Sequence, residues 1–344
     1  MLTGIVRDDR YLDHMPGHTH PEHPSRLRII HEMLDSNPPD GLVHIPAELA
    51  TLEELELVHT PTYVKKVLKT AEQTYTSLAP DTPACAKSYQ SAWLAAGGCL
   101  RAVDALMARQ CEACFCLVRP PGHHALADRA GGFCFFNNLG ITARYAKKTY
   151  GLRRILIVDW DIHFGNGFQA LFASDPSVLC FSSHDMLLYP YSGEMEDIGD
   201  GPGLGYMVNL PLSRTFEDGD MIHIYGELLA PVIRRYNPEL VLVAAGFDGH
   251  REDPIGRSRM TSRGYGDLTR MLRAMLPEAS NPPLLLTLEG GYNPRAMTKS
   301  VREVLAALAD SKPETPAPES FSPEAEALVD RVRKVHNPYG VWVG

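Results

Sequence analysis

The sequence predicts an α/β fold in which a parallel sheet is covered by helices on both faces. Five apolar runs are too short for helices, and most are rich in Val, Ile and Leu, as buried parallel strands are. Helical patterns lie between the runs, and strands that alternate with helices are typical of a parallel sheet. Each run is followed directly by a polar motif.

The predicted elements follow one another from the middle of the chain onward. The expected strands are residues 113–118, 154–158, 178–182, 239–245 and 284–288. The clearest helical patterns are 91–109 and 139–149. The motifs that follow the strands are RPPGHH, DWDIHFGNG, SSHD, GFDGHREDP and EGGYN. Because open α/β sheets bind ligands beyond the carboxyl ends of their strands, the five motifs are expected to form one site.

Composition limits the class of protein. The 344 residues include 44% apolar residues, enough for a large core, but no run approaches the roughly 20 apolar residues of a membrane span. The N-terminus has no secretory signal pattern, and seven cysteines in apolar segments fit reduced thiols, so a cytoplasmic protein is expected. A net charge of -9 argues against binding to nucleic acid and is compatible with a cationic substrate or partner.

A metal site is expected after the second predicted strand. If that strand continues through His163, then Asp159, Asp161 and His163 share one face, because side chains alternate along a strand. Such crowding is costly unless a cation compensates the charge. Asp248 follows another strand and can converge on the same point. Three ligands with an open position describe a catalytic zinc site, although Fe(II) or Co(II) would also suit these donors. The alternative is that Asp159 and Asp248 only cap helices.

Two other segments resemble metal sites more weakly. The segment 111–116, CEACFC, contains a CxxC spacing without a second ligand pair, so we interpret its cysteines as core residues. The histidine-rich segment 14–23 is interpreted as a rim loop.

The motifs also supply groups for catalysis. His123 and His124 lie in a loop fixed by prolines, and histidine is the usual base near neutral pH. Asp159 and Asn166 are candidate partners, and the ring paired with an amide would be the better resting base because a carboxylate raises the pKa of its partner more. Tyr292 would donate to a developing oxyanion, or it is simply a packed turn aromatic.

Five motifs together resemble the zinc-dependent histone deacetylase family, which includes bacterial acetylpolyamine amidohydrolases. They are RPPGHHA, GFCFFNN, VDWDIHFGNG, GFDGHREDP and EGGYN. The resemblance covers about residues 10 to 310 and implies the arginase-deacetylase fold, with a central eight-stranded parallel sheet flanked by helices. We therefore expect one catalytic domain, residues 1–310. The Pro- and Glu-rich stretch 311–323 indicates a linker, so residues 311–344 are expected to be a linker and tail packed on the surface or at an oligomer interface. The VDWD and GNG motifs are most similar to the class II branch and its bacterial relatives.

The resemblance assigns roles to the residues of these motifs. It implies a zinc-dependent deacetylase in which Asp161, His163 and Asp248 bind zinc, while Asp159 becomes a partner of His123. His124, opposite Asn166, acts as general base and then acid, His123 gives electrostatic support, and Tyr292 polarises the amide carbonyl. A structural potassium ion is implied at Asp159, Asp161, His163, Ser182 and Ser183.

The substrate-binding residues are implied in the same way. Gly132 and Phe133 of the GFCFF motif, together with Tyr189, match the walls of a narrow tunnel. The remaining matches are Arg26 in an inner cavity, Asp81 at the rim and Ile255 as gatekeeper. Two residues depart from the commoner pattern: Phe164 replaces a histidine, and Tyr189 replaces a phenylalanine.

The expected reaction is hydrolysis of an N-acylated amine. An apolar Ile255 offers no charge to a cationic tail, which favours acyl-lysine peptides or proteins over acetylated polyamines, unless Glu22 or Glu252 supplies a carboxylate. A binuclear manganese ureohydrolase is disfavoured, because the later motif reads Asp248-Gly249-His250 rather than Asp-x-Asp. A non-catalytic sensor is disfavoured by the intact catalytic set. The apolar tail, residues 335–344, would dock on its own chain or in a homo-oligomer.

Overall fold

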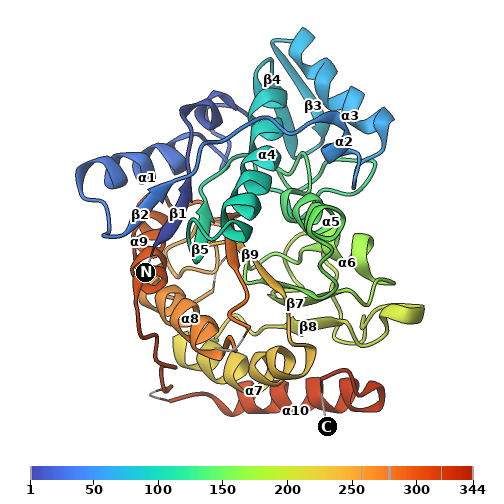
Figure 1. The fold of residues 1–344 in the computed structure, drawn as a ribbon, viewed down its shortest axis with the longest axis vertical. Helices are drawn as coiled ribbons and strands as arrows, with labels where there is room; N and C mark the ends of the chain where they lie inside the picture. Colours follow the sequence, from blue (N-terminus) through green and yellow to red (C-terminus); the bar gives the residue numbers. More distant parts are fainter. Residues whose placement is uncertain (1, 257, 278–279, 319, 343–344) are drawn as a thin grey trace.

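The computed structural model describes residues 2–256, 258–277, 280–318 and 320–342 (Figure 1). Its centre is an eight-stranded sheet in which all neighbouring strands run parallel. In spatial order the strands are β2 (Leu42–His44), β1 (Thr3–Val6), β5 (Ala113–Cys116), β10 (Leu284–Leu288), β9 (Leu240–Ala245), β6 (Ile155–Asp159), β7 (Val178–His184) and β8 (Met207–Pro211). The predicted fold class is therefore confirmed.

The five apolar runs form the five adjacent strands β5, β10, β9, β6 and β7 of this sheet. Every residue in these strands is buried, which explains why they are continuously apolar. Strands β1, β2 and β8 were not predicted from the residues. Strand β2 is a three-residue edge strand without a buried residue, and β8 is interrupted by Asn209.

Helices cover the sheet in layers. The helices are α1 (Ser25–Ser36), α2 (Leu52–Leu55), α3 (Pro61–Leu68), α4 (Ser88–Met107), α5 (Asn138–Tyr150), α6 (Asn166–Phe172), α7 (Asp218–Tyr236), α8 (Ser262–Met275), α9 (Pro294–Ala309) and α10 (Pro323–His336). On one side α4 packs on β1, β5 and β10, and α5 packs on β9. Helices α9, α8 and α7 pack one against the next, and α1 lies against α9 (Figure 1). A separate antiparallel pair is formed by β3 (Tyr75–Ala79) and β4 (Thr82–Cys85).

The C-terminal segment contains a helix that the sequence did not predict. Helix α10 packs along the outer side of α7 (Figure 1), and Trp342 beyond it is buried in the main core. In the part of the chain that is described, no helix combines the length and apolar character needed to cross a membrane.

The register of the sheet brings the polar motifs together. Asp159 at the end of β6 is paired with Ser182 of β7 on one side and with Ala244 of β9 on the other. Strand β10 pairs with β9 through Leu288 and Ala245 and with β5 through Thr287 and Cys116. The segments that follow these strands therefore leave the same edge of the sheet.

Candidate active site

Three side chains with metal-ligating atoms meet at this edge. Asp161, His163 and Asp248 are buried, and one ligating atom from each lies within 4.8 Å of the other two. Nδ1 of His163 lies 3.1 Å from Oδ1 of Asp161 and 2.9 Å from Oδ2 of Asp248. One ring nitrogen cannot neutralise two buried carboxylates. Two carboxylate oxygens and one imidazole are a donor set that fits a divalent cation such as zinc.

Strand β6 ends before this group, which corrects the expectation that the strand continues through His163. It ends at Asp159, and the following residues bend. Asp161 then turns toward β10 and accepts a hydrogen bond from the backbone N–H of Gly290 at 2.8 Å. A Cβ at Gly290 would lie 2.0 Å from the Asp248 carboxylate, so only glycine allows this approach.

Asp159 points to a histidine instead. Its Oδ2 lies 3.1 Å from Nδ1 of His123, whereas Nε2 of His123 lies 3.9 Å from Asp161. Burial opposes a charge on His123, but the charges of Asp161 and Asp159 outweigh it and raise the pKa of His123 to about 10. His123 is therefore a cation at neutral pH.

His124 has the opposite character, although its ring centroid is only 3.9 Å from that of His123. Its Nδ1 lies 2.8 Å from Oδ1 of Asn166, at the start of α6. With Nδ1–H donating to that amide oxygen, Nε2 keeps a free lone pair. Burial, together with the charges of His123 and His163, holds the pKa of His124 well below its ordinary value. The ring is neutral and able to accept a proton.

Tyr292 is held in its turn by a carboxylate that the sequence analysis missed. Asp253 accepts hydrogen bonds from the backbone N–H groups of Tyr292 and Asn293 on one oxygen, and from those of Ile255 and Gly256 on the other. Asp253 thereby links the segment of Ile255, the expected gatekeeper, to the segment of Tyr292, the expected oxyanion donor. Burial raises the pKa of Tyr292, so its phenol is neutral.

The expected wall residues lie around this group. The Phe133 ring is 5.7 Å from that of Tyr292 at 87°, and the Tyr189 ring is 4.8 Å from that of His124 at 89°. Gly132 has a φ of 54°, and a Cβ there would lie 2.2 Å from the His124 ring. Phe133 also has a left-handed φ, 67°, which is strained for a phenylalanine.

Asp81 stabilises this strained turn from outside. Its Oδ2 accepts a hydrogen bond from the N–H of Gly132 at 3.0 Å, and the neighbouring Thr82 hydroxyl accepts one from Phe133 at 3.2 Å. Half-buried Asp81 is therefore already engaged by its own chain.

Arg26 is also brought to the site, but Glu22 is not available at the rim. The Arg26 guanidinium lies 4.9 Å from the centroid of the Tyr292 ring. Glu22 is fully buried and ion-paired, so it cannot supply a carboxylate to a substrate tail, and His14 is likewise buried. The interpretation of residues 14–23 as a rim loop was thus wrong for these two residues. Glu252 is exposed.

The remaining expected residues lie beside the group rather than in it. The hydroxyl of Ser182 lies 3.0 Å from Nδ1 of His184, and the hydroxyl of Ser183 lies 2.8 Å from that of Tyr225. Phe164 is buried with its ring 4.6 Å from that of His184. The residue that departs from the commoner pattern of the resembling family thus makes an aromatic contact with His184.

Glu289 is a further residue that sequence reasoning missed. Its Oε2 accepts hydrogen bonds from the N–H groups of Gly122 and His123, which fixes the histidine loop against β10. Burial raises the pKa of Glu289 to about 7. The only signal was its place at the end of the last apolar run.

Comparison with known proteins identifies the family. The model of the histone deacetylase domain matches residues 20–308. A probable deacetylase of Archaeoglobus fulgidus is 35% identical over 98% of this chain and 99% of its own length. A polyamine deacetylase HDAC10 of Danio rerio is 36% identical over 92% of this chain, which spans about half of that protein (49%). The crystal structure of an HDA15 HD domain matches with a TM-score of 0.92 at 34% identity, covering 99% of this chain and 97% of that one. The chain has the arginase-deacetylase fold and belongs to the histone deacetylase family.

Proposed function

We propose that this chain is a zinc-dependent deacetylase that removes acetyl or other acyl groups from the amine of lysine-like substrates. One observation carries the proposal: a buried set of two carboxylates and one imidazole lies beside a neutral, amide-paired histidine. That combination suits hydrolysis of an amide by activated water.

Asp161, His163 and Asp248 would hold the metal. When bound there, a divalent cation polarises a carbonyl oxygen and makes a water molecule more acidic. Fe(II) and Co(II) also suit these donors. We further propose that the segments of Asp159 and Ser182, which lie side by side in the sheet, hold a structural potassium ion.

His124 would carry the proton through the reaction. Its Nε2 accepts a proton from the attacking water as the water oxygen bonds to the acyl carbon. The same nitrogen then returns a proton to the amine nitrogen as the carbon–nitrogen bond breaks, so acid and amine leave in balance. His123, held as a cation by Asp159, stabilises negative charge nearby.

Tyr292 and the aromatic walls would orient the substrate. The neutral phenol of Tyr292 donates a hydrogen bond to the carbonyl oxygen as negative charge develops there. Phe133 and Tyr189 flank the path to His124 and suit an unbranched aliphatic chain. Arg26 behind Tyr292 would contact the acyl product.

The gatekeeper favours acyl-lysine over polyamine substrates. Ile255 carries no charge, and the burial of Glu22 removes one of the two carboxylates that would have attracted a cationic tail. Exposed Glu252 remains near Ile255 in the chain. Acetylpolyamine hydrolysis is the second candidate, because a relative of 36% identity bears the name polyamine deacetylase.

The seven cysteines support a reducing compartment for this activity. All are free thiols, and six of them are buried. We propose the cytoplasm on this ground.

The decisive experiment measures acetate release by zinc-loaded protein from an acetyl-lysine peptide and from N-acetylputrescine, each with and without chelator. We expect chelator-sensitive turnover that favours the peptide. A preference for the polyamine would mean that a carboxylate such as Glu252 overrides Ile255. If neither these substrates nor longer acyl chains are hydrolysed, the proposed activity is wrong.

A further inference from the structure

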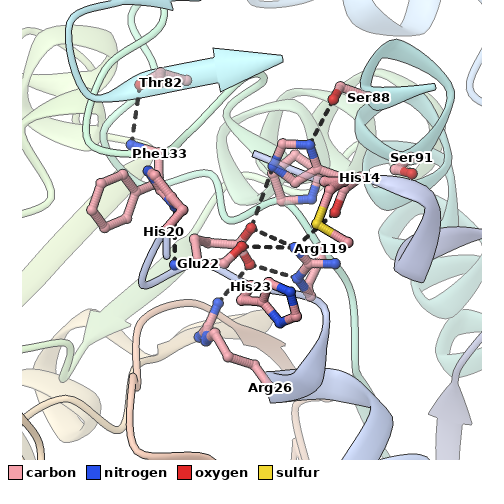
Figure 2. Close-up of polar contacts among 12 residues, drawn as sticks. His14, His20, Glu22, His23, Arg26, Thr82, Ser88, Ser91, Arg119 and Phe133 are labelled. Carbon is pink, nitrogen blue, oxygen red and sulfur yellow. Dashed lines mark hydrogen bonds and ion pairs between the residues drawn. The ribbon is translucent and has the colours of Figure 1, made fainter. Parts of the chain in front are cut away.

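A buried cluster of charged side chains is centred on Glu22 (Figure 2). Glu22 and Arg119 are 0% exposed, and Arg26 and His14 are 1% exposed. Burial lowers the pKa of His14, so the cluster contains two cations and one anion. Among the described residues, Glu22 is the only carboxylate that forms an ion pair with either arginine.

The Glu22 carboxylate joins the two arginines directly. Its Oε1 accepts hydrogen bonds from Nη1 of Arg26 at 2.7 Å and from Nε of Arg119 at 2.6 Å. Its Oε2 accepts a second bond from Arg119 at 2.7 Å and lies 3.3 Å from Nε2 of His14. Figure 2 shows both guanidinium groups directed at this one carboxylate.

Each arginine is connected to a different segment of the candidate active site. Arg26 donates to the backbone carbonyls of Glu289 and Gly291 at 2.5 Å, and these residues lead directly into Tyr292. Arg119 precedes the loop that carries His124. Its guanidinium donates to the backbone carbonyl of Tyr11 at 2.8 Å as well as to Glu22, so the side chain is held by both segments.

The backbone of Glu22 makes a third connection on the outer side. Its N–H donates to Nδ1 of His20 at 3.1 Å, and the His20 ring lies 4.7 Å from the Phe133 ring at 75° (Figure 2). The segment that carries Glu22 therefore also supports a wall of the expected tunnel.

We propose that Glu22 is a positioning residue, whose carboxylate fixes the loop of His124 and the turn of Tyr292 relative to one another. This role rests on the proposed function for its effect on catalysis. A buried ion triad is weak evidence for stability, because apolar side chains of similar volume are often as stable. The triad instead sets a distance. Because Oε1 of Glu22 accepts from both Arg26 and Arg119, it fixes the separation between the two segments that these arginines contact.

The test compares Glu22→Gln with the control Asp220→Asn in zinc-loaded protein. Asp220, in helix α7, is also a buried carboxylate. It accepts hydrogen bonds from the backbone N–H groups of Glu217 and Ser322. The amide of Glu22→Gln keeps one accepting oxygen but turns an NH2 group toward Nη2 of Arg119, so the second bond to Arg119 is lost together with the negative charge between the two guanidinium groups. We expect kcat to fall by about tenfold to a hundredfold, as for misplaced catalytic groups, with KM changed less than about threefold. Asp220→Asn should lower Tm and leave kcat unchanged.

A double-mutant cycle separates positioning from general destabilisation. In a Tyr292→Phe background, Glu22→Gln should cost much less than in the wild type, because part of its effect acts through Tyr292. The proposal would be overturned if the double variant lost kcat by the product of the two single fold-losses. A folded Glu22→Gln protein with wild-type kcat would also overturn it. If Glu22→Gln does not fold, Glu22→Asp keeps the charge but shortens its reach and carries the same test.

Amide hydrogen exchange gives a readout that does not depend on activity. Exchange at the amides of residues 122–124 and 289–293 should rise in Glu22→Gln, whereas Asp220→Asn should affect only residues near 217–222. An inactive wild type would refute the proposed function and leave this measurement valid. Unchanged exchange in both segments would refute the role of Glu22.

Discussion

Charged side chains are buried at the carboxyl edge of the sheet but partly exposed in the outer layer, which here means helices α5 and α6 and the turn after α6. At the edge, Asp159, Asp161 and Asp248 are at most 1% exposed and crowd together with histidines. In the outer layer, Asp175 pairs with Arg144 through side chains that are 20% and 33% exposed. Exposed pairs contribute little, whereas buried like charges are costly. The difference indicates that the edge is arranged for chemistry at the expense of stability.

Removing a carboxylate from the edge should have the largest effect. In Asp248→Asn, one of two anionic ligands is lost, so the protein should bind less than one equivalent of zinc. Turnover should fall by more than about a hundredfold, since even the loss of an outer partner of a ligand costs tenfold to a hundredfold. Elemental analysis and acetate release check this. A variant with one firmly bound zinc ion and wild-type turnover would remove Asp248 from the site.

Removing the phenol donor should have the next largest effect. Tyr292→Phe is expected to lower kcat by about a hundredfold with little change in KM, because the hydrogen bond strengthens only as the oxyanion develops. Tyr145→Phe is the matched control: its hydroxyl donates to Asp104 at 2.8 Å, between helices α5 and α4, and kcat should stay unchanged. Equal kcat in both variants would assign Tyr292 a packing role only.

The same contrast explains what could be predicted from the sequence. The strands β5, β6, β7, β9 and β10 are central and buried on both faces, so their apolar runs identified them. Strand β2 lies at the edge without a buried residue and left no such signal. Periodicity alone placed Asp159 with the ligands, because a sequence does not show that β6 ends there and bends.

The supporting carboxylates were beyond sequence reasoning for a related reason. Asp253, Glu289 and Glu22 act through backbone groups or arginines of distant segments, at separations of 39, 167 and 97 residues. No local pattern distinguishes such a residue from a solvated loop carboxylate. Only the tertiary fold shows that Glu22 faces inward.

A smaller change tests why His124 differs from His123. Asn166→Asp would give His124 a carboxylate partner, as His123 already has, and raise the pKa of His124 by about one unit or more. A general base must be deprotonated, so activity is lost as pH falls through this pKa. The acid limb of kcat/KM should therefore move to higher pH. Asn237→Asp, in the exposed cap after α7, should leave the profile unchanged. An unmoved limb in Asn166→Asp would mean that another group limits the rate.

The smallest effect is expected in the outer layer itself. Burial opposes ionisation of Asp175, but hydrogen bonds from Lys147 and Ser177 outweigh it and lower its pKa from 3.8 to about 2. Because the pKa is lower in the folded state, the stabilisation is present above about pH 4 and is lost as pH falls through about 2. Asp175→Asn should lower the free energy of unfolding at neutral pH by less than about 1 kcal/mol, as for exposed pairs. The difference from wild type should shrink as pH falls from about 4 and vanish only below pH 2, and kcat should not change. Denaturant unfolding at several pH values measures this, and a large loss of kcat would show that charge in the outer layer does reach the site.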